Sequence, residues 1–370
     1  MLSKIESMAP QVLARIAGHC DSDTFKALTS TSLHMRFQLR DCRHKNVHVE
    51  IERYSDLTHT RHILKYLQTR TRTSECIIIG SMTFTINASN KRKRASSEKT
   101  PFTDLPLLIL DCIGAVRSLR ILTLEIQHLD VLQENCFFGL LKGFKIQADN
   151  VHVNASPRIM QRVIQNSPQV QALHIFREVN INHHFVFGRN LRGLYLNIRR
   201  GQNGYRKEIP TIDGDLLDSL MVQCPCLEEL VLYQWLEQRE TLTQVEQASG
   251  TRNVIDISTF WRFFSKNIRK LQKLPGLRRL AITIDVGVAS ELGRQWYGEH
   301  ESSEFYMNCI CQIAAHLLQL NEIAIFDAGD FYWHGIKTHY TGMNIKVHSL
   351  RKESKGFPTS ITLGTTTRAC

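Results

Sequence analysis

The sequence lacks the features that would place it in a membrane or in an oxidising compartment. Its 370 residues contain no apolar run long enough to cross a bilayer, since the longest candidate, Leu105 to Leu110, has six residues. Lys4, Glu6 and Pro10 interrupt the stretch where a signal peptide needs a continuous apolar core. We therefore expect a cytoplasmic or nuclear protein whose ten cysteines are reduced thiols.

The motifs of the common enzyme classes are also missing from the sequence. It has no GxxxxGK[ST] phosphate loop, no GxGxxG after a strand, no HExxH pair and no GxSxG nucleophile elbow. Its acidic residues are scattered, without a pairing that helix or strand periodicity would bring together. We therefore expect no catalytic residues, no cofactor and no enzymatic activity of the chain itself.

Two cysteine pairs, Cys224 with Cys226 and Cys309 with Cys311, raise the question of a zinc site. Structural zinc sites usually space their cysteines two to four residues apart in tight turns, whereas a single residue separates each pair here. Cys309 and Cys311 fall in an apolar helical pattern, where such neighbours point about 200° apart. We expect buried thiols and no bound metal.

The net charge of +11 is compatible with an acidic protein partner or with nucleic acid, and is diagnostic of neither. One concentrated basic run, Lys91 to Arg94, lies in a polar segment, 87–100, that is predicted to be a flexible loop. That run is either a nuclear-localisation patch or an ordinary solvated loop. Aromatic residues do not interleave with it as a stacking platform requires, so a nucleic-acid partner is not favoured.

The first forty residues form three short amphipathic segments joined by almost no connecting chain. Pro10 suits the first turn of a helix whose apolar stripe contains Val12, Leu13 and Ile16. Two further segments follow, and their capping residues Asp21 or Ser22 and Thr31-Ser32 precede Phe25 and Leu33 respectively. About 35 residues cannot bury enough surface to be stable alone, so this unit needs a neighbour or a partner.

The order of these residues resembles an F-box, through Met8 to Leu13, then Ile16, Asp23 to Phe25, Leu28 and Ser32 to Arg36. Gln11 stands where the family usually has Glu, and Met35 where it often has an aromatic residue. The resemblance implies docking on a Skp-type adaptor and, through it, on a cullin. Some of the docking side chains would also hold the three helices together; the set that we assign is Met8, Pro10, Val12, Leu13, Ile16, Phe25 and Leu28.

From residue 119 onward a hydrophobe-x-x-hydrophobe-x-hydrophobe pattern recurs, which is the strand signature of leucine-rich repeats. The last two hydrophobes alternate along a strand and face one side, and the first sits in the turn before it. The copies begin at Leu119, Leu141, Val170, Leu191, Leu227, Leu277, Leu320 and, as a doubtful last copy, Tyr340.

Helical patterns precede several of these strands, which indicates a repeating helix, turn and strand. They span 156–166, 213–222 and 305–318. The segment Cys224 to Leu232 resembles the joint of F-box-associated leucine-rich repeats. The copies are irregularly spaced, and the long intervals hold polar insertions at 199–208, 237–253 and 286–303 that could shape a binding site.

Together these patterns predict an α/β protein with two domains. Residues 1–42 would form a three-helix F-box-like domain, and 43–370 an irregular leucine-rich-repeat solenoid with parallel strands inside and helices outside. The resemblance implies the substrate-recognition subunit of a cullin-RING ubiquitin ligase, which binds an unidentified target protein through the repeats. The alternative is a repeat scaffold that binds another protein without any ligase role.

Overall fold

The structure is a computed structural model that describes about two thirds of the chain: residues 5, 7–9, 12–13, 16–17, 20, 22–39, 46–51, 61–67, 69, 79–87, 105–116, 119–127, 129, 131–180, 186–199, 214–233, 257–284, 302–326, 331–338 and 342–349. The basic run Lys91 to Arg94 lies outside these residues, as do the polar insertion 237–253 and, apart from residues 199, 302 and 303, the insertions 199–208 and 286–303. The chain divides into two compact units, 1–167 and 168–370, while the predicted boundary at residue 42 stays a prediction. Within the described ranges no helix is long and apolar enough to span a bilayer.

The first unit begins with short helices that share a small core. Residues 12–13 and 16–17 are helical, and α2 (Ser22–Ser30) and α3 (Leu33–Gln38) follow. Ser32 caps α3 as its sequence predicts, because its side chain accepts a hydrogen bond from the Met35 N–H at 3.1 Å. The shared core consists of Leu13, Ala17, Met35 and Leu39.

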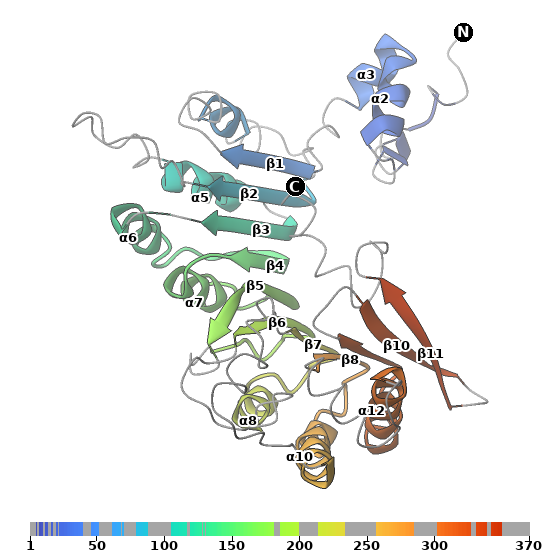
Figure 1. The fold of residues 1–370 in the computed structure, drawn as a ribbon. Helices are drawn as coiled ribbons and strands as arrows, with labels where there is room; N and C mark the ends of the chain where they lie inside the picture. Colours follow the sequence, from blue (N-terminus) through green and yellow to red (C-terminus); the bar gives the residue numbers. More distant parts are fainter. Residues whose placement is uncertain are drawn as a thin grey trace, which may run out of the picture. The chain divides into compact units, whose positions relative to one another are not determined.

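Four parallel strands of the first unit pair in chain order, each in register with the next. Adding strands on one edge through right-handed connections places every intervening helix on the same face of the sheet. Figure 1 shows these helices along one side of the strands. The elements are β1 (Asn46–Ile51), β2 (Ser81–Asn87), α5 (Leu105–Ala115), β3 (Leu119–Gln127), α6 (Val131–Leu140), β4 (Ala148–Asn154) and α7 (Pro157–Gln165).

The second unit repeats this arrangement with five parallel strands, again paired in chain order, and then closes with an antiparallel hairpin. Its helices also precede the strands that they cover (Figure 1). The elements are β5 (Ala172–Asn180), β6 (Gly193–Arg199), α8 (Gly214–Gln223), β7 (Glu229–Tyr233), α10 (Ile257–Lys270), η2 (Leu271–Lys273), β8 (Arg279–Thr283), α12 (Ser302–His316), β9 (Glu322–Phe326), β10 (Phe331–Thr338) and β11 (Gly342–Ser349).

Three successive strands of the second unit, β7, β8 and β9, start with the same backbone joint. The carbonyl of Arg192 accepts hydrogen bonds from the N–H groups of Glu228 and Glu229, at 2.7 and 2.9 Å. The carbonyl of Glu228 does the same for Arg278 and Arg279, and that of Arg278 for the first residues before and in β9. The copies are 36, 50 and 43 residues apart. The same pattern of hydrogen bonds therefore forms although the chain between successive strands varies in length.

Two predicted copies of the repeat pattern were wrong. Residues 141–147 form no strand, because α6 ends in a turn where Gly143 has a φ of 81°, which favours glycine. The strand β4 begins later, and its Val151 and Val153 lie in register with Leu122 and Leu124 of β3. Tyr340 lies outside the described residues, and Met343 and Ile345 belong to β11, which is antiparallel to its neighbour.

Burial decides the role of two aromatic residues and of the paired cysteines in the second unit. Tyr332 and Trp333 of β10 are buried, and the Trp333 ring stacks on Tyr306 of α12 with centroids 4.0 Å apart. These two aromatic residues therefore belong to the core and do not form an exposed contact site. The expectation of buried thiols was correct for Cys224 and Cys309 and wrong for Cys226 and Cys311, which are exposed. Cys309 and Cys311 differ because residues two apart on a helix point to different sides.

Candidate binding surfaces

The residues assigned to adaptor docking divide into exposed and buried side chains. Met8, Val12 and Ile16 are 39%, 47% and 40% exposed, whereas Leu13 is fully buried in the core of the N-terminal helices. Phe25 and Leu28 are half-buried and pack against that core, and Pro10 lies outside the described residues. The residues assigned from the sequence therefore include both exposed side chains and side chains of the core beneath them.

The exposed apolar side chains of these helices are what we call the N-terminal apolar surface. Val12 and Ile16 lie four residues apart on the first helical segment, which places them on one stripe, and Ile5 and Met8 are exposed in the chain before it. Leu33 and Phe37 lie four residues apart on α3, and they are 80% and 61% exposed. Large apolar side chains gathered on so small a unit indicate a contact surface. The members are Ile5, Met8, Val12, Ile16, Leu33 and Phe37.

A second candidate surface is the face of β1 to β4 that the helices leave uncovered, here called the polar face. Along each strand, buried hydrophobes that point to the helices alternate with half-buried or exposed residues that point away. The strand registers align the residues that point away in rows across the sheet. The polar face comprises His48, Glu50, Ser81, Thr83, Thr85, Ile121, Thr123, Glu125, Asn150, His152 and Asn154.

Hydroxyl, amide, imidazole and carboxylate groups of the polar face lie within reach of one another. The Thr85 hydroxyl donates to a Glu125 carboxylate oxygen at 3.4 Å, and the His48 Nε2 lies 3.6 Å from a Glu50 carboxylate oxygen. Burial lowers the pKa of His152 to about 4, so this imidazole is neutral at pH 7. The described side chains of the face include two carboxylates and no Lys or Arg. Such a surface suits a polar partner segment that carries cationic side chains.

The corresponding face of the second unit is a second apolar core. Tyr195, Val231, Ala281 and Ala324 lie in one register row across β6 to β9, and all four are buried. The same cluster includes Phe326 and Tyr332, against which Tyr233 of β7 packs. The burial of these side chains therefore stabilises the fold.

Charged residues form a ladder at the start of these strands. Arg279 Nη2 lies 2.7 Å from a Glu229 carboxylate oxygen, and His334 Nε2 lies 3.3 Å from a Glu322 carboxylate oxygen. Burial raises the pKa of Glu229, while the Tyr195 hydroxyl donates a hydrogen bond to its carboxylate and Arg279 offsets part of the effect. Because these charged groups pair with one another, we assign the ladder to stabilising the fold.

Sequence reasoning missed the polar face, although the signal was present. The residues between the hydrophobes of NVHVEI, SMTFTIN, TLEIQ and NVHVN are almost all polar, while the equivalent residues of ELVLY and EIAIF are largely apolar. No group of three His, Cys, Asp or Glu residues that could hold a metal ion occurs in the described part of the chain.

Comparison with known proteins adds no relative to this description. Neither the known protein-family models nor the curated protein sequences give a match to this chain.

Proposed function

We propose that this protein is the substrate-recognition subunit of an SCF-type cullin-RING ubiquitin ligase. In this proposal the helices of residues 1–42 form an F-box that docks on a Skp-type adaptor, and the adaptor links the chain to a cullin. The strands and helices that follow form a leucine-rich-repeat-like solenoid that holds a target protein.

The N-terminal apolar surface is the observation that carries the proposal. Val12 and Ile16 are exposed on helices that already have a core of their own, built on Leu13 and Met35. A surface residue that only supported folding would be buried with that core. The order of the residues resembles an F-box, and exposed apolar side chains are what an adaptor groove requires.

The repeated backbone joints support the solenoid part of the proposal. Each joint places one hydrophobe in the turn and the next two under a helix, and these three positions are buried in the copies that begin at Leu191, Leu227, Leu277 and Leu320. Within each unit, parallel strands in chain order with all helices on one side are the geometry of such repeats. The helix-free side is then available for a partner wherever it is polar.

The polar face of the first unit is the part of the repeats that we assign to target binding. Its hydroxyl, amide and imidazole groups offer hydrogen bonds, and Glu50 and Glu125 offer carboxylates for cationic side chains of the target. The chain performs no bond chemistry in this role. It contributes proximity, since a held target reacts as if at high local concentration.

The test is co-purification of the full chain with a Skp-type adaptor and a cullin. We expect the wild type to retain both, and Val12→Asp/Ile16→Asp to lose them, because burying two unpaired charges in the adaptor interface costs several kcal/mol. Val222→Asp is the matched control, since Val222 is also an exposed helical valine, at 79% exposure on α8. Leu13→Asp is unsuitable as a test because Leu13 belongs to the core, so its loss of binding would report unfolding.

Retention of the adaptor by a folded Val12→Asp/Ile16→Asp variant would contradict the proposed interface. A wild-type chain that retains neither adaptor nor cullin would favour the alternative, a repeat scaffold without a ligase role. The polar face supports that alternative equally, because it does not depend on the N-terminal helices.

A further inference from the structure

A third candidate surface, on the helical side of the second unit, is rich in Lys and Arg. The segment from α10 through β8, Ile257–Thr283, contains seven Lys and Arg residues and no Asp or Glu. Lys270 and Arg279 pair with acidic side chains from neighbouring elements, Asp218 and Glu229. With seven cations and no carboxylate of its own, this segment is a concentrated source of the net positive charge.

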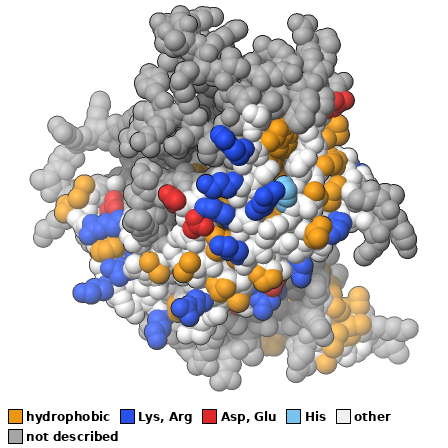
Figure 2. Space-filling view, turned by 90° about the horizontal axis from the view of Figure 1, so that it is seen from below, with side chains coloured by type: hydrophobic (Ala, Val, Ile, Leu, Met, Phe, Trp, Pro, Cys, Tyr) orange, Lys and Arg blue, Asp and Glu red, His pale blue; other side chains and the backbone are white. Residues whose placement is uncertain are grey.

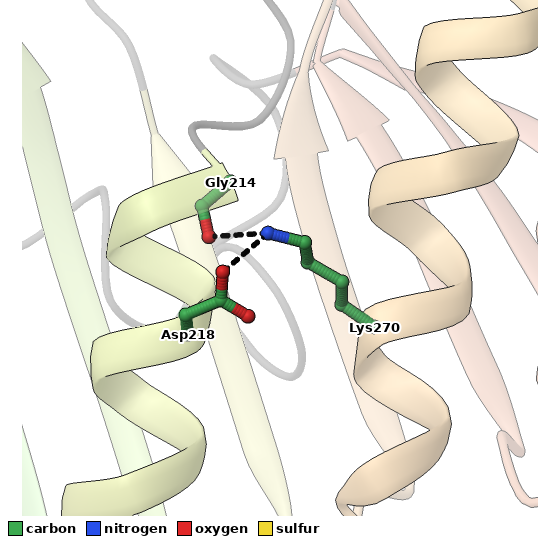
Figure 3. A network of polar contacts seen from close by, with 3 residues as sticks. All are labelled: Gly214, Asp218 and Lys270. Carbon is green, nitrogen blue, oxygen red and sulfur yellow. Dashed lines mark hydrogen bonds and ion pairs between the residues drawn. The ribbon is translucent and has the colours of Figure 1, made fainter.

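The rotation of α10 about its own axis is fixed by contacts on two sides. Phe260, Phe264 and Ile268 are buried on its inner side. Lys270 reaches across to α8, where its Nζ donates to the Gly214 carbonyl at 3.0 Å and to the Asp218 carboxylate (Figure 3). With the inner side and one flank held, the opposite side of α10 must face solvent.

That outward side carries three exposed cations, Arg262, Lys266 and Arg269, and a fourth, Lys273, follows in η2; we call these four residues the basic stripe. At 3.6 residues per turn the three cations of α10 fall within an arc of about 60°, opposite the buried aromatic rings. Like charges three and four residues apart repel, and the segment supplies no carboxylate to offset that repulsion. Figure 2 shows Lys and Arg side chains gathered near the centre of the face seen from below.

We propose that the basic stripe binds an acidic, extended segment of a partner protein. The three cations on α10 are separated by about 4.5–6 Å along the helix axis, at 1.5 Å per residue, and Lys273 follows beyond the end of the helix. Alternate residues of an extended chain are about 6.6 Å apart. Asp or Glu at alternate positions of a partner can therefore each meet one cation, and every such pair relieves part of the repulsion within α10.

Nucleic acid fits the same surface less well. Single strands bind on exposed aromatic platforms, and the rings of Phe260 and Phe264 on this helix face inward. A protein that makes about 6–10 phosphate contacts with a duplex needs more cations than the four side chains of α10 and η2 provide. An acidic peptide needs only a short row of cations.

This inference does not rest on the ligase role. The basic stripe belongs to the second unit, whereas the adaptor surface and the polar face belong to the first. Adaptor retention and acidic-peptide binding are measured separately, so either proposal can fail while the other stands.

The experiment measures binding of the full chain to a fluorescein-labelled peptide of alternating Glu and Ser by fluorescence anisotropy, at low and at physiological salt. We expect Lys266→Glu/Arg269→Glu to weaken binding by about tenfold or more, because like charges then face the peptide. Lys142→Glu/Lys145→Glu is the matched control. It changes the net charge equally at two exposed lysines of the first unit, and we expect an effect below about twofold.

Three results would overturn the inference: no binding of the peptide by the wild type at low salt, equal weakening by the control variant, or tighter binding of duplex or single-stranded DNA than of the peptide at matched salt. Circular dichroism verifies folding of each variant. Lys266→Ala/Arg269→Ala, which only removes charge, replaces the reversal variant should that one misfold, and is expected to weaken binding in the same direction.

Discussion

The two units use the same repeat of helix, turn and parallel strand, yet they use the helix-free face of their sheets in opposite ways. In the first unit that face presents residues such as Thr83, Thr123 and His152, all half-buried. In the second it presents Val231 and Ala281, which are buried in an apolar cluster. The hydrophobes that face the helices build the repeat, and the residues between them decide whether the other face is a surface or a second core.

The largest expected effect comes from placing the same charge on equivalent strands of the two faces. Val231→Asp should destabilise the protein by about 4 kcal/mol or more, because a carboxylate replaces a side chain that is 1% exposed. Thr83→Asp, on the polar face beside His48, should change stability by less than about 1 kcal/mol. Urea unfolding followed by circular dichroism measures both. Equal losses at the two positions would show that the two faces are not different in kind.

Acidification should affect the first unit through His152. The pKa of His152 is about 4 in the folded protein, against an ordinary value of 6.5. Between these two pH values the imidazole is protonated in the unfolded chain and neutral in the folded one. Stability is therefore fully present above pH 6.5 and is lost as the pH falls toward 4, by roughly 2–3 kcal/mol.

His152→Gln removes the titrating group, so its stability should fall less than that of the wild type over the same pH range. Urea midpoints collected between pH 7 and pH 4 for both proteins test this. Parallel curves would mean that His152 is as free to take up a proton in the folded protein as in the unfolded one.

The smallest expected effect distinguishes two ion pairs of the second unit. Arg279→Met should cost about 2 kcal/mol, because Glu229, whose side chain is only 12% exposed, is left without its cation. Arg192→Met breaks the pair with Glu228, in which both side chains are more than half exposed, and should cost less than about 0.5 kcal/mol. Thermal unfolding of the two variants side by side measures the difference, and a larger loss at Arg192 would contradict this account of the ladder.

Much of the local structure was readable from the sequence. The helices near 157–165 and 214–223 form where periodicity predicts them, and Ser32 caps α3 as expected. The copy at Leu141 failed because three hydrophobes in the right spacing also fit the end of a helix and the chain that follows it. The copy in β4 was missed because small Ala148, Val151 and Val153 carry a weaker signal than leucine.

By itself, the sequence determined which segments alternate, where helices begin and which residue types stand between the hydrophobes. It could not separate Val12 from Leu13, because both lie on one predicted stripe and only the packing of Met35 and Leu39 buries the second. It also could not show which strand face meets the helices, or that Lys270 fixes the outward side of α10. Periodicity is a local property of the chain, whereas burial depends on which distant residue arrives at the other side.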